Sequence, residues 1–130
     1  MASEPEAGRI VWWDLTVPDA EAVRDFYADL LGWTAKDHPV GDYVDYEMRP
    51  AGSEETVAGI CHQRGANADL PPVWLPYVRV ADVDAAAARA LARGGRIVAG
   101  PRAMGGSRFC VVEDPAGAKL ALFGPAAPEA

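Results

Sequence analysis

The stretch VPDAEAVRDFYADLLGW, residues 17–33, decides how the first half of this 130-residue chain folds. A β-branched and aromatic run, residues 9–17, leads into it, and Pro18 ends the predicted strand. Asp19 is a typical helix N-cap and Gly32 a typical C-cap. Between the caps, apolar residues recur at helical spacing: Ala22, Val23, Phe26, Tyr27, Leu30 and Leu31. The pattern predicts a strand followed by an amphipathic helix.

Turn residues divide the rest of the chain into further predicted elements. In the first half, we expect strands near 33–38, 42–49 and 55–62, followed by a linker at 63–72 that ends in two prolines. In the second half, Asp82 is the predicted N-cap of a helix that ends before Gly94 and Gly95. This helix spans 82–93. The second half also has predicted strands at 73–81, near 96–99, at 107–113 and at 118–124, with a turn at 114–117.

The two halves repeat each other at an offset of 63 residues. Subtracting 63 places Val80 on Val17, Asp82 on Asp19, Gly95 on Gly32 and Ala121 on Ala58. A constant offset predicts two copies of one βαβββ module, at 9–62 and 73–124. A chain of 130 residues has room for one core, so we expect a single domain over 9–124, with loose tails at 1–8 and 125–130.

Composition excludes several classes of protein. A net charge of −7 argues against nucleic-acid binding, which depends on neutralising phosphates. No apolar run is long enough to span a membrane, and the first residues are acidic, so we expect a cytoplasmic protein. Cys61 and Cys110 are isolated in apolar runs, which is typical of buried, reduced thiols.

Three motifs together resemble the vicinal oxygen chelate superfamily. They are V-x-D at Val17 to Asp19, F-Y-x-x-L-L-G-W at Phe26 to Trp33, and D-P-x-G-x-x-L-x-L-F at Asp114 to Phe123. This group includes glyoxalase I, the bleomycin resistance proteins and the extradiol dioxygenases, and the resemblance covers residues 9–124. It implies an α+β fold in which two βαβββ modules form an open, cupped, eight-stranded mixed sheet with the helices on its convex face. It also implies a small-molecule ligand on the concave face and a homodimer.

In metal-dependent members of the superfamily, the ligands come from the first and last strand of each module. The motifs place those positions at Trp12, Leu75 and Ala121, and the repeat offset places the fourth at Ala58. An indole, an isobutyl group and two methyl groups provide no donor for a divalent ion. We therefore predict no metal and no cofactor; a site shifted to Asp14 and His62 is the alternative.

Strand alternation extends the resemblance to a set of predicted ligand-binding residues. These are Trp12, Asp14, Ala58, Ile60, Leu75, Tyr77, Arg79, Lys119, Ala121 and Phe123, with Arg108 added if the turn at 114–117 is tight. A longer turn would instead direct Phe109, Val111 and Glu113 to the ligand side. The same choice stays open between Tyr43, Asp45 and Glu47 and the alternating set Val44, Tyr46 and Met48.

Three functions are compatible with these residues. The first is a metal-free protein that binds an aromatic or cationic secondary metabolite or antibiotic, with Trp12 either stacking on the ligand or filling the former metal pocket. The second is a metal-independent lyase, isomerase or cyclase that uses Asp14 with Tyr77 or His62 as acid and base. The third is a metal-dependent enzyme with shifted ligands. A regulatory or accessory subunit without a ligand of its own is the alternative to all three.

Overall fold

The structure is a computed structural model in which residues 6–127 are described. The chain divides into two compact units: unit 2 comprises Trp13–Trp74, and unit 1 comprises the described residues up to Trp12 and from Leu75 onward. The outer parts of both predicted tails, residues 1–5 and 128–130, lie outside the described residues. The elements of the first half are β1 (Ile10–Val17), α1 (Ala20–Leu31), β2 (Thr34–Val40), β3 (Tyr43–Arg49) and β4 (Ala58–His62). Those of the second are β5 (Trp74–Arg79), α2 (Val83–Ala92), β6 (Arg96–Met104), β7 (Ser107–Glu113) and β8 (Lys119–Pro125).

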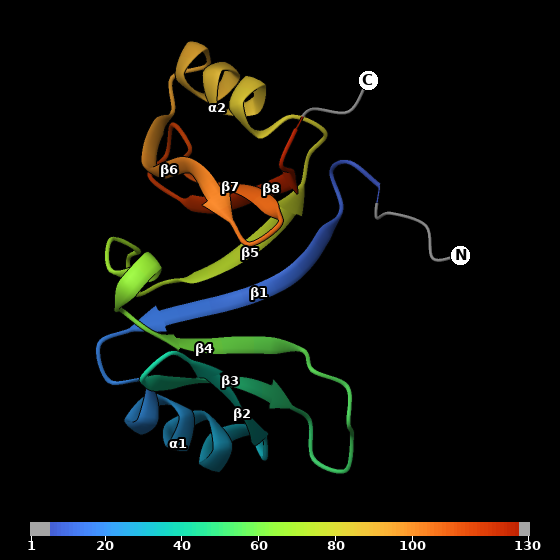
Figure 1. Ribbon diagram of the computed structural model, residues 1–130, viewed down its shortest axis with the longest axis vertical. Coiled ribbons are helices and arrows are strands. Elements are labelled where there is room, and N and C mark those ends of the chain that lie inside the picture. Colours follow the sequence, from blue (N-terminus) through green and yellow to red (C-terminus); the bar gives the residue numbers. More distant parts are fainter. Residues whose placement is uncertain (1–5, 128–130) are drawn as a thin grey trace. The chain divides into compact units, whose positions relative to one another are not determined.

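The predicted α+β class is confirmed. Hydrogen bonds join the strands in the order β2-β3-β4-β1-β5-β8-β7-β6, which is an open, eight-stranded mixed sheet (Figure 1). Each module contributes four strands and one helix, as the βαβββ pattern predicts. No helix within residues 6–127 is long and apolar enough to cross a membrane.

The predicted helix caps are present in both modules. The Asp19 side chain accepts a hydrogen bond of 3.1 Å from the amide of Ala22, and Gly32 ends α1 with a φ of 73°. Asp82 caps α2 in the same way, accepting from the Ala85 amide at 3.0 Å. An N-cap of this kind stabilises a helix by about 1 kcal/mol, because it satisfies an amide that has no partner within the helix.

Unit 2 has its core between α1 and the strands of the first module. Leu15, Tyr46, Met48 and Ile60 are buried there against the helix. These residues come from β1, β3 and β4, so that one face of the three strands supports α1.

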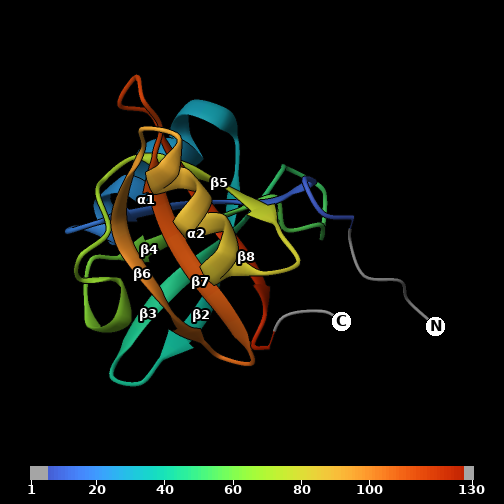
Figure 2. The same ribbon diagram turned by 90° about the horizontal axis from the view of Figure 1, so that it is seen from above.

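Unit 1 has a second core beneath α2, which crosses β6, β7 and β8 (Figure 2). Val83 and Ala87 of the helix pack there against Cys110, Val112 and Leu122 of the strands. Cys110 is buried and Cys61 is partly buried, and both are free thiols.

The two modules depart from a constant offset at their last strand. Tyr77 pairs with Ala121 in the second module. In the first module, Asp14, which is 63 residues before Tyr77, pairs with Gly59 and not with Ala58. The prediction that one gap-free offset runs through both modules is therefore wrong at β4, where the register has moved by one residue.

This shift moves two predicted ligand-binding residues to the other face of the sheet, because side chains alternate along a strand. Ala58 pairs with Met48 and Ile60 with Tyr46, and both partners belong to the α1 core. The predicted place of Ala58 and Ile60 beside Asp14 is therefore wrong. Gly59 lies beside Asp14 instead.

Candidate functional site

The positions at which the resemblance places metal ligands carry no such ligand in this chain. With the register corrected, the four positions are Trp12, Gly59, Leu75 and Ala121. None has an imidazole, carboxylate or thiolate group, so the residues do not fit a divalent ion. Over the described part of the chain, no three His, Cys, Asp or Glu side chains form a group that could hold a metal ion. Asp14 and His62, the alternative site, are therefore not part of such a group.

Unit 2 has a polar face on the side of its strands opposite α1. Alternation along β1 directs Asp14 and Thr16 away from the core residues Leu15 and Val17. Gly59 pairs with both Asp14 and Glu47, which brings these two carboxylates onto the same face of the two strands that flank β4. We define the polar face of unit 2 as Asp14, Thr16, Asp45, Glu47, Gly59 and Cys61.

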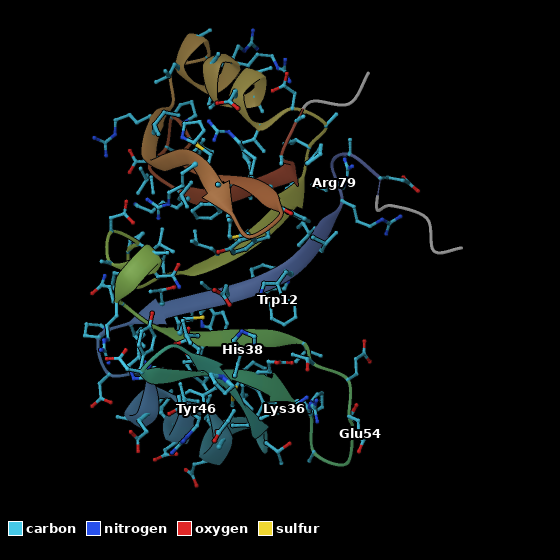
Figure 3. The ribbon with its side chains drawn as sticks, in the orientation of Figure 1. Trp12, Lys36, His38, Tyr46, Glu54 and Arg79 are labelled. Atoms are coloured by element: carbon cyan, nitrogen blue, oxygen red, sulfur yellow. The ribbon has the colours of Figure 1, made fainter. Side chains whose placement is uncertain are left out.

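Both carboxylate oxygens of Glu47 have a hydrogen-bond partner. Thr56 donates from Oγ1 to Glu47 Oε1 at 3.2 Å, and Nδ1 of His38 lies 3.3 Å from Glu47 Oε2. Burial raises the pKa of Glu47. The hydrogen bonds from Thr56 and His38 and the charge of Lys36 lower it, and together they outweigh burial, so the pKa is below its ordinary value. His38 and Lys36 come from β2, the edge strand of this unit (Figure 3). Glu47 is therefore ionised at neutral pH.

Asp45 holds His62 at the end of β4. Its Oδ1 atom accepts a 2.8 Å hydrogen bond from the His62 amide and lies 3.3 Å from His62 Nδ1. The His62 side chain is 17% exposed, and its ring lies edge-on to Tyr43 with centroids 5.6 Å apart. The prediction offered His62 as a partner of Asp14, whereas the structure pairs it with Asp45. An oriented imidazole beside a carboxylate can accept and release a proton.

Asp14 contacts a thiol. The Cys61 thiol donates to Asp14 Oδ2 at 3.4 Å. Burial raises the pKa of the Cys61 thiol, and the negative charges of Asp14 and Asp45 raise it further. A thiol that stays protonated is a poor nucleophile, so Cys61 is a structural neighbour of the two acids and not a reactive group.

An apolar pocket lies on the opposite, α1 side of unit 2. Trp13, Trp33, Val57, Ala58 and Trp74 line this pocket, whose volume is about 260 Å³. The rings of Trp33 and Trp74 meet edge to face at 6.2 Å. The indole nitrogen of Trp74 donates to the hydroxyl of Tyr27 at 3.1 Å, which fixes its ring.

In unit 1, most of the predicted residues share the face opposite α2. Tyr77 pairs with Ala121 and Arg79 with Phe123. Their opposites on β8, Leu120 and Leu122, belong to the α2 core, which confirms the predicted sorting of this strand. The sequence left open which set of alternating side chains on β7 faces the ligand side. Val111 pairs with Ala121, which pairs with Tyr77, so Phe109, Val111 and Glu113 share the face of Tyr77. The Tyr77 and Phe109 rings stack there at 5.9 Å, and Lys119 Nζ lies 3.2 Å from Glu113 Oε1.

The prediction for Arg108 is wrong. Its guanidinium forms a bidentate pair with Asp84 on α2, from Nε to Oδ2 at 2.8 Å and from Nη2 to Oδ1 at 3.0 Å. The next residue on the same side of β7, Cys110, lies in the α2 core. The loop between β7 and β8 runs over residues 114–118, one residue more than the tight turn that would have directed Arg108 to the other face.

Sequence reasoning left open whether Asp45 and Glu47 face the ligand side, and it did not name His38 as a site residue. A signal for the two acids was present, because Val44, Tyr46 and Met48 form an apolar set that alternates with them. An apolar set belongs against a helix, which assigns Asp45 and Glu47 to the other face. His38 carries no such signal, since its position depends on how β2 pairs with β3.

Comparison with known proteins agrees with this architecture. The profile of the Glyoxalase/Bleomycin resistance protein/Dioxygenase superfamily matches residues 9–122, so the chain belongs to this superfamily. It is 33% identical over 123 residues to "Putative glyoxylase CFP32" of Mycobacterium tuberculosis, covering 93% of this chain and 47% of that protein. It is also 33% identical over 128 residues to "Anthracycline biosynthesis protein DnrV" of Streptomyces peucetius, covering 89% of this chain and 46% of that protein. The chain thus spans about half the length of these curated relatives.

Solved structures show the same fold at lower identity. A variant of Streptomyces coelicolor methylmalonyl-CoA epimerase in complex with 2-nitronate-propionyl-CoA superposes with a TM-score of 0.53 at 20% identity, covering 96% of this chain and 99% of that one. A superfamily member from Vibrio splendidus gives a TM-score of 0.56 at 15% identity, covering 87% of this chain and 96% of that one.

Proposed function

We propose that this protein binds a small aromatic or cationic metabolite without a metal, as a cytoplasmic member of its superfamily. The observation that supports the proposal is the polar face of unit 2, where Asp14 on β1 and Asp45 and Glu47 on β3 flank the intervening strand β4. Lys36 and Arg49 on the same side lie at the β2 and β3 edge, and Arg64, which lies over Tyr43, is paired with Asp42, so the centre of the face around Asp14 and Glu47 is acidic.

The ligand class follows from the chemistry of this face. Carboxylates attract a cationic group, and the ring of Tyr43 beside His62 already has a cation against it, since the Arg64 guanidinium lies 4.3 Å from its centroid. Trp12 precedes Asp14 by two residues on β1, and alternation gives its indole the same side of that strand. The name of one relative refers to biosynthesis of an anthracycline, a planar aromatic compound, which supports an aromatic ligand for this chain as well.

A titration with proflavine, a planar aromatic cation, tests this proposal. We expect saturable binding and thermal stabilisation, while the planar acid 9-anthracenecarboxylate binds at least about tenfold more weakly. The double variant Asp14→Asn and Asp45→Asn keeps the shapes and removes two charges, and it should weaken proflavine binding about tenfold or more. Asp25→Asn on the exposed side of α1 is the matched control and should change nothing. Equal binding of the two dyes, or unchanged binding by the double variant, would refute the cation site.

The same titration with Trp12→Ala separates the two roles predicted for this indole. A stacking role predicts a loss of proflavine affinity of about tenfold or more, because stacking of a planar ring system on an aromatic side chain contributes about 1–3 kcal/mol. A filling role predicts lower thermal stability with unchanged affinity.

A metal-independent enzyme is the second candidate. Two imidazole and carboxylate pairs favour it, His62 with Asp45 and His38 with Glu47. Ligands found in a thermal-shift screen of natural products should be recovered and analysed by mass spectrometry: unchanged compound supports binding, and a converted compound supports catalysis. Stoichiometric binding of added nickel, manganese, iron or zinc would contradict the metal-free proposal.

We also propose that the protein forms a homodimer through the exposed apolar side of α1. Phe26, Leu30 and Leu31 are 60%, 62% and 50% exposed, and Trp13 on β1 is 44% exposed. Apolar side chains gathered in this way mark an interaction surface. Relatives about twice as long have room for a second unit of this size, which supports a second copy of this chain as the partner.

A further inference from the structure

The apolar pocket of unit 2 lies on the opposite side of the strands from the polar face. Trp13, one of its lining residues, precedes Asp14 on β1, so alternation directs its indole to the side of the core residue Leu15. Ala58, another lining residue, is 3% exposed and pairs with the core residue Met48. The pocket is therefore separate from the carboxylates of the proposed cation site.

Two of the three indoles that line this pocket are fixed before any ligand binds. Trp33 and Trp74 pack against the α1 core, and their ring planes meet at 84°, so they form two perpendicular walls. The ring of Tyr27 lies edge-on to Trp74 at 5.4 Å, and its hydroxyl accepts the hydrogen bond from the Trp74 indole. Walls that are already in place lose little conformational entropy when a ligand binds.

The third indole is the open side of the pocket. Trp13 is 44% exposed, whereas Trp33 and Trp74 are partly buried. A molecule that enters the pocket contacts an indole that is otherwise in water. Removing this apolar surface from water favours binding, and the flat ring favours an aromatic partner.

The volume and the lining select the ligand. A volume of about 260 Å³ exceeds the roughly 150 Å³ of an apolar cavity that accepts benzene, so a compound of one or two rings fits. Besides the three indoles, the lining residues are Val57 and Ala58, and none is charged. A charged group would lose its water here without gaining an ion-pair partner, whereas an uncharged ring packs against the indoles.

We infer that this pocket binds an uncharged aromatic group of one or two rings, held by Trp13, Trp33 and Trp74. The inference does not rest on the proposed cation site, which uses carboxylates on the other side of the strands and a charged ligand. Trp13 also borders the proposed dimer surface, and the Leu30→Glu variant separates the pocket from that surface.

Indole is a suitable probe, and the Nε1–H signals of the four tryptophans report on it in nuclear magnetic resonance spectra of the full chain labelled with nitrogen-15. We expect unlabelled indole to move the signals of Trp13, Trp33 and Trp74 to saturation with one dissociation constant. Tetramethylammonium is the ligand that an aromatic cage for cations would prefer, and it should bind at least about tenfold more weakly than indole.

Variants locate the binding in the pocket. Val57→Phe fills the pocket and should weaken indole binding about tenfold or more, while Val40→Phe at the end of β2, outside the lining, should leave it unchanged. Trp13→Ala removes the exposed indole and should also weaken binding about tenfold. Met104→Ala is the matched control, since Met104 is 40% exposed and lies on β6. Leu30→Glu should bind indole as the parent does, because Leu30 does not line the pocket.

The inference is overturned if the three pocket signals do not saturate, or if indole moves the Trp12 signal alone. Tetramethylammonium binding as tightly as indole would show a cage for cations instead. Undiminished binding by a folded Trp13→Ala or Val57→Phe would place indole elsewhere, and if Trp13→Ala does not fold, Val57→Phe decides. Loss of indole binding by Leu30→Glu would assign the pocket to the interface between two copies and would also overturn it as a small-molecule site.

Discussion

Asp14 on β1 lies directly opposite Gly59 on β4, whereas Tyr77, its counterpart on β5, lies opposite Ala121 on β8. This one-residue difference decides which side chains of β4 face the polar side of unit 2. It removes Ala58 and Ile60 from that side and places Gly59 and Cys61 on it. Gly59, which carries no side chain, pairs with both Asp14 and Glu47 and separates these two carboxylates.

The buried position of Ile60 can be tested by its contribution to stability. Ile60 is 0% exposed in the α1 core, so Ile60→Ala should lower the free energy of unfolding by about 2–4 kcal/mol. Ile10 is 51% exposed, and the same substitution there should cost less than about 1 kcal/mol. Urea unfolding of both variants gives the comparison. Similar losses at the two positions would show that Ile60 is not a core residue.

Gly124 should be intolerant of any side chain. A Cβ atom at this position would overlap the carbonyl oxygen of Val80, where β8 passes close to the start of the α2 segment. Gly124→Ala should therefore destabilise the protein by about 3 kcal/mol, because the Val80 carbonyl belongs to the backbone and cannot rotate away as a side chain could. A Cβ at Gly106 would meet nothing within 4 Å, which makes Gly106→Ala the control. Thermal unfolding of the two variants checks the difference.

Glu113 should make the protein sensitive to acid. Hydrogen bonds from Arg96 and then Lys119 lower the pKa of Glu113 from 4.5 to about 2. Because the pKa is depressed in the folded state, this stabilisation is complete above about pH 4.5 and is lost as the pH falls towards about 2.

Glu113→Gln should flatten the dependence of the urea midpoint on pH over that range, while Glu54→Gln on the loop before β4 should leave it as in the parent protein. A parent-like slope in Glu113→Gln would contradict the proposed role of this carboxylate.

Both thiols should react slowly in the folded protein. Burial raises the pKa of Cys61 and of Cys110, and nearby carboxylates raise both further, so few thiolates are present at mildly alkaline pH. Labelling with a thiol-reactive disulfide should be at least about tenfold slower in the native state than in urea. Asp14→Asn removes one of the charges beside Cys61 and should accelerate labelling there but not at Cys110. Equal acceleration at both thiols would indicate general loosening of the fold.

The proposed dimer should dissociate when charge enters the exposed side of α1. Leu30 is 62% exposed, so Leu30→Glu costs little in the monomer but places a carboxylate in an apolar interface. Light scattering coupled to size exclusion should give twice the monomer mass for the parent and the monomer mass for the variant. Leu91→Glu on α2, where Leu91 is 57% exposed, is the control. A monomeric parent would end this proposal.

The sequence by itself determined the elements and their order, because caps, turns and apolar spacing act locally. Asp19 and Gly32 fixed the ends of α1, and the motifs from Val17 to Trp33 and from Asp114 to Phe123 fixed the family. The lack of metal ligands at Trp12, Leu75 and Ala121 was also readable, since it depends on residue types alone.

Only the tertiary structure decided which face each strand presents. The modules differ where turns and helices differ in length: α1 has 12 residues and α2 has 10, and β4 begins at Ala58 after β3 ends at Arg49. Such differences shift the pairing of strands far apart in sequence, and a shift of one residue exchanges the two faces. For that reason Ile60 and Arg108 were assigned to the wrong side, and only cross-strand pairing decided between the two possible faces for Asp45 and Glu47.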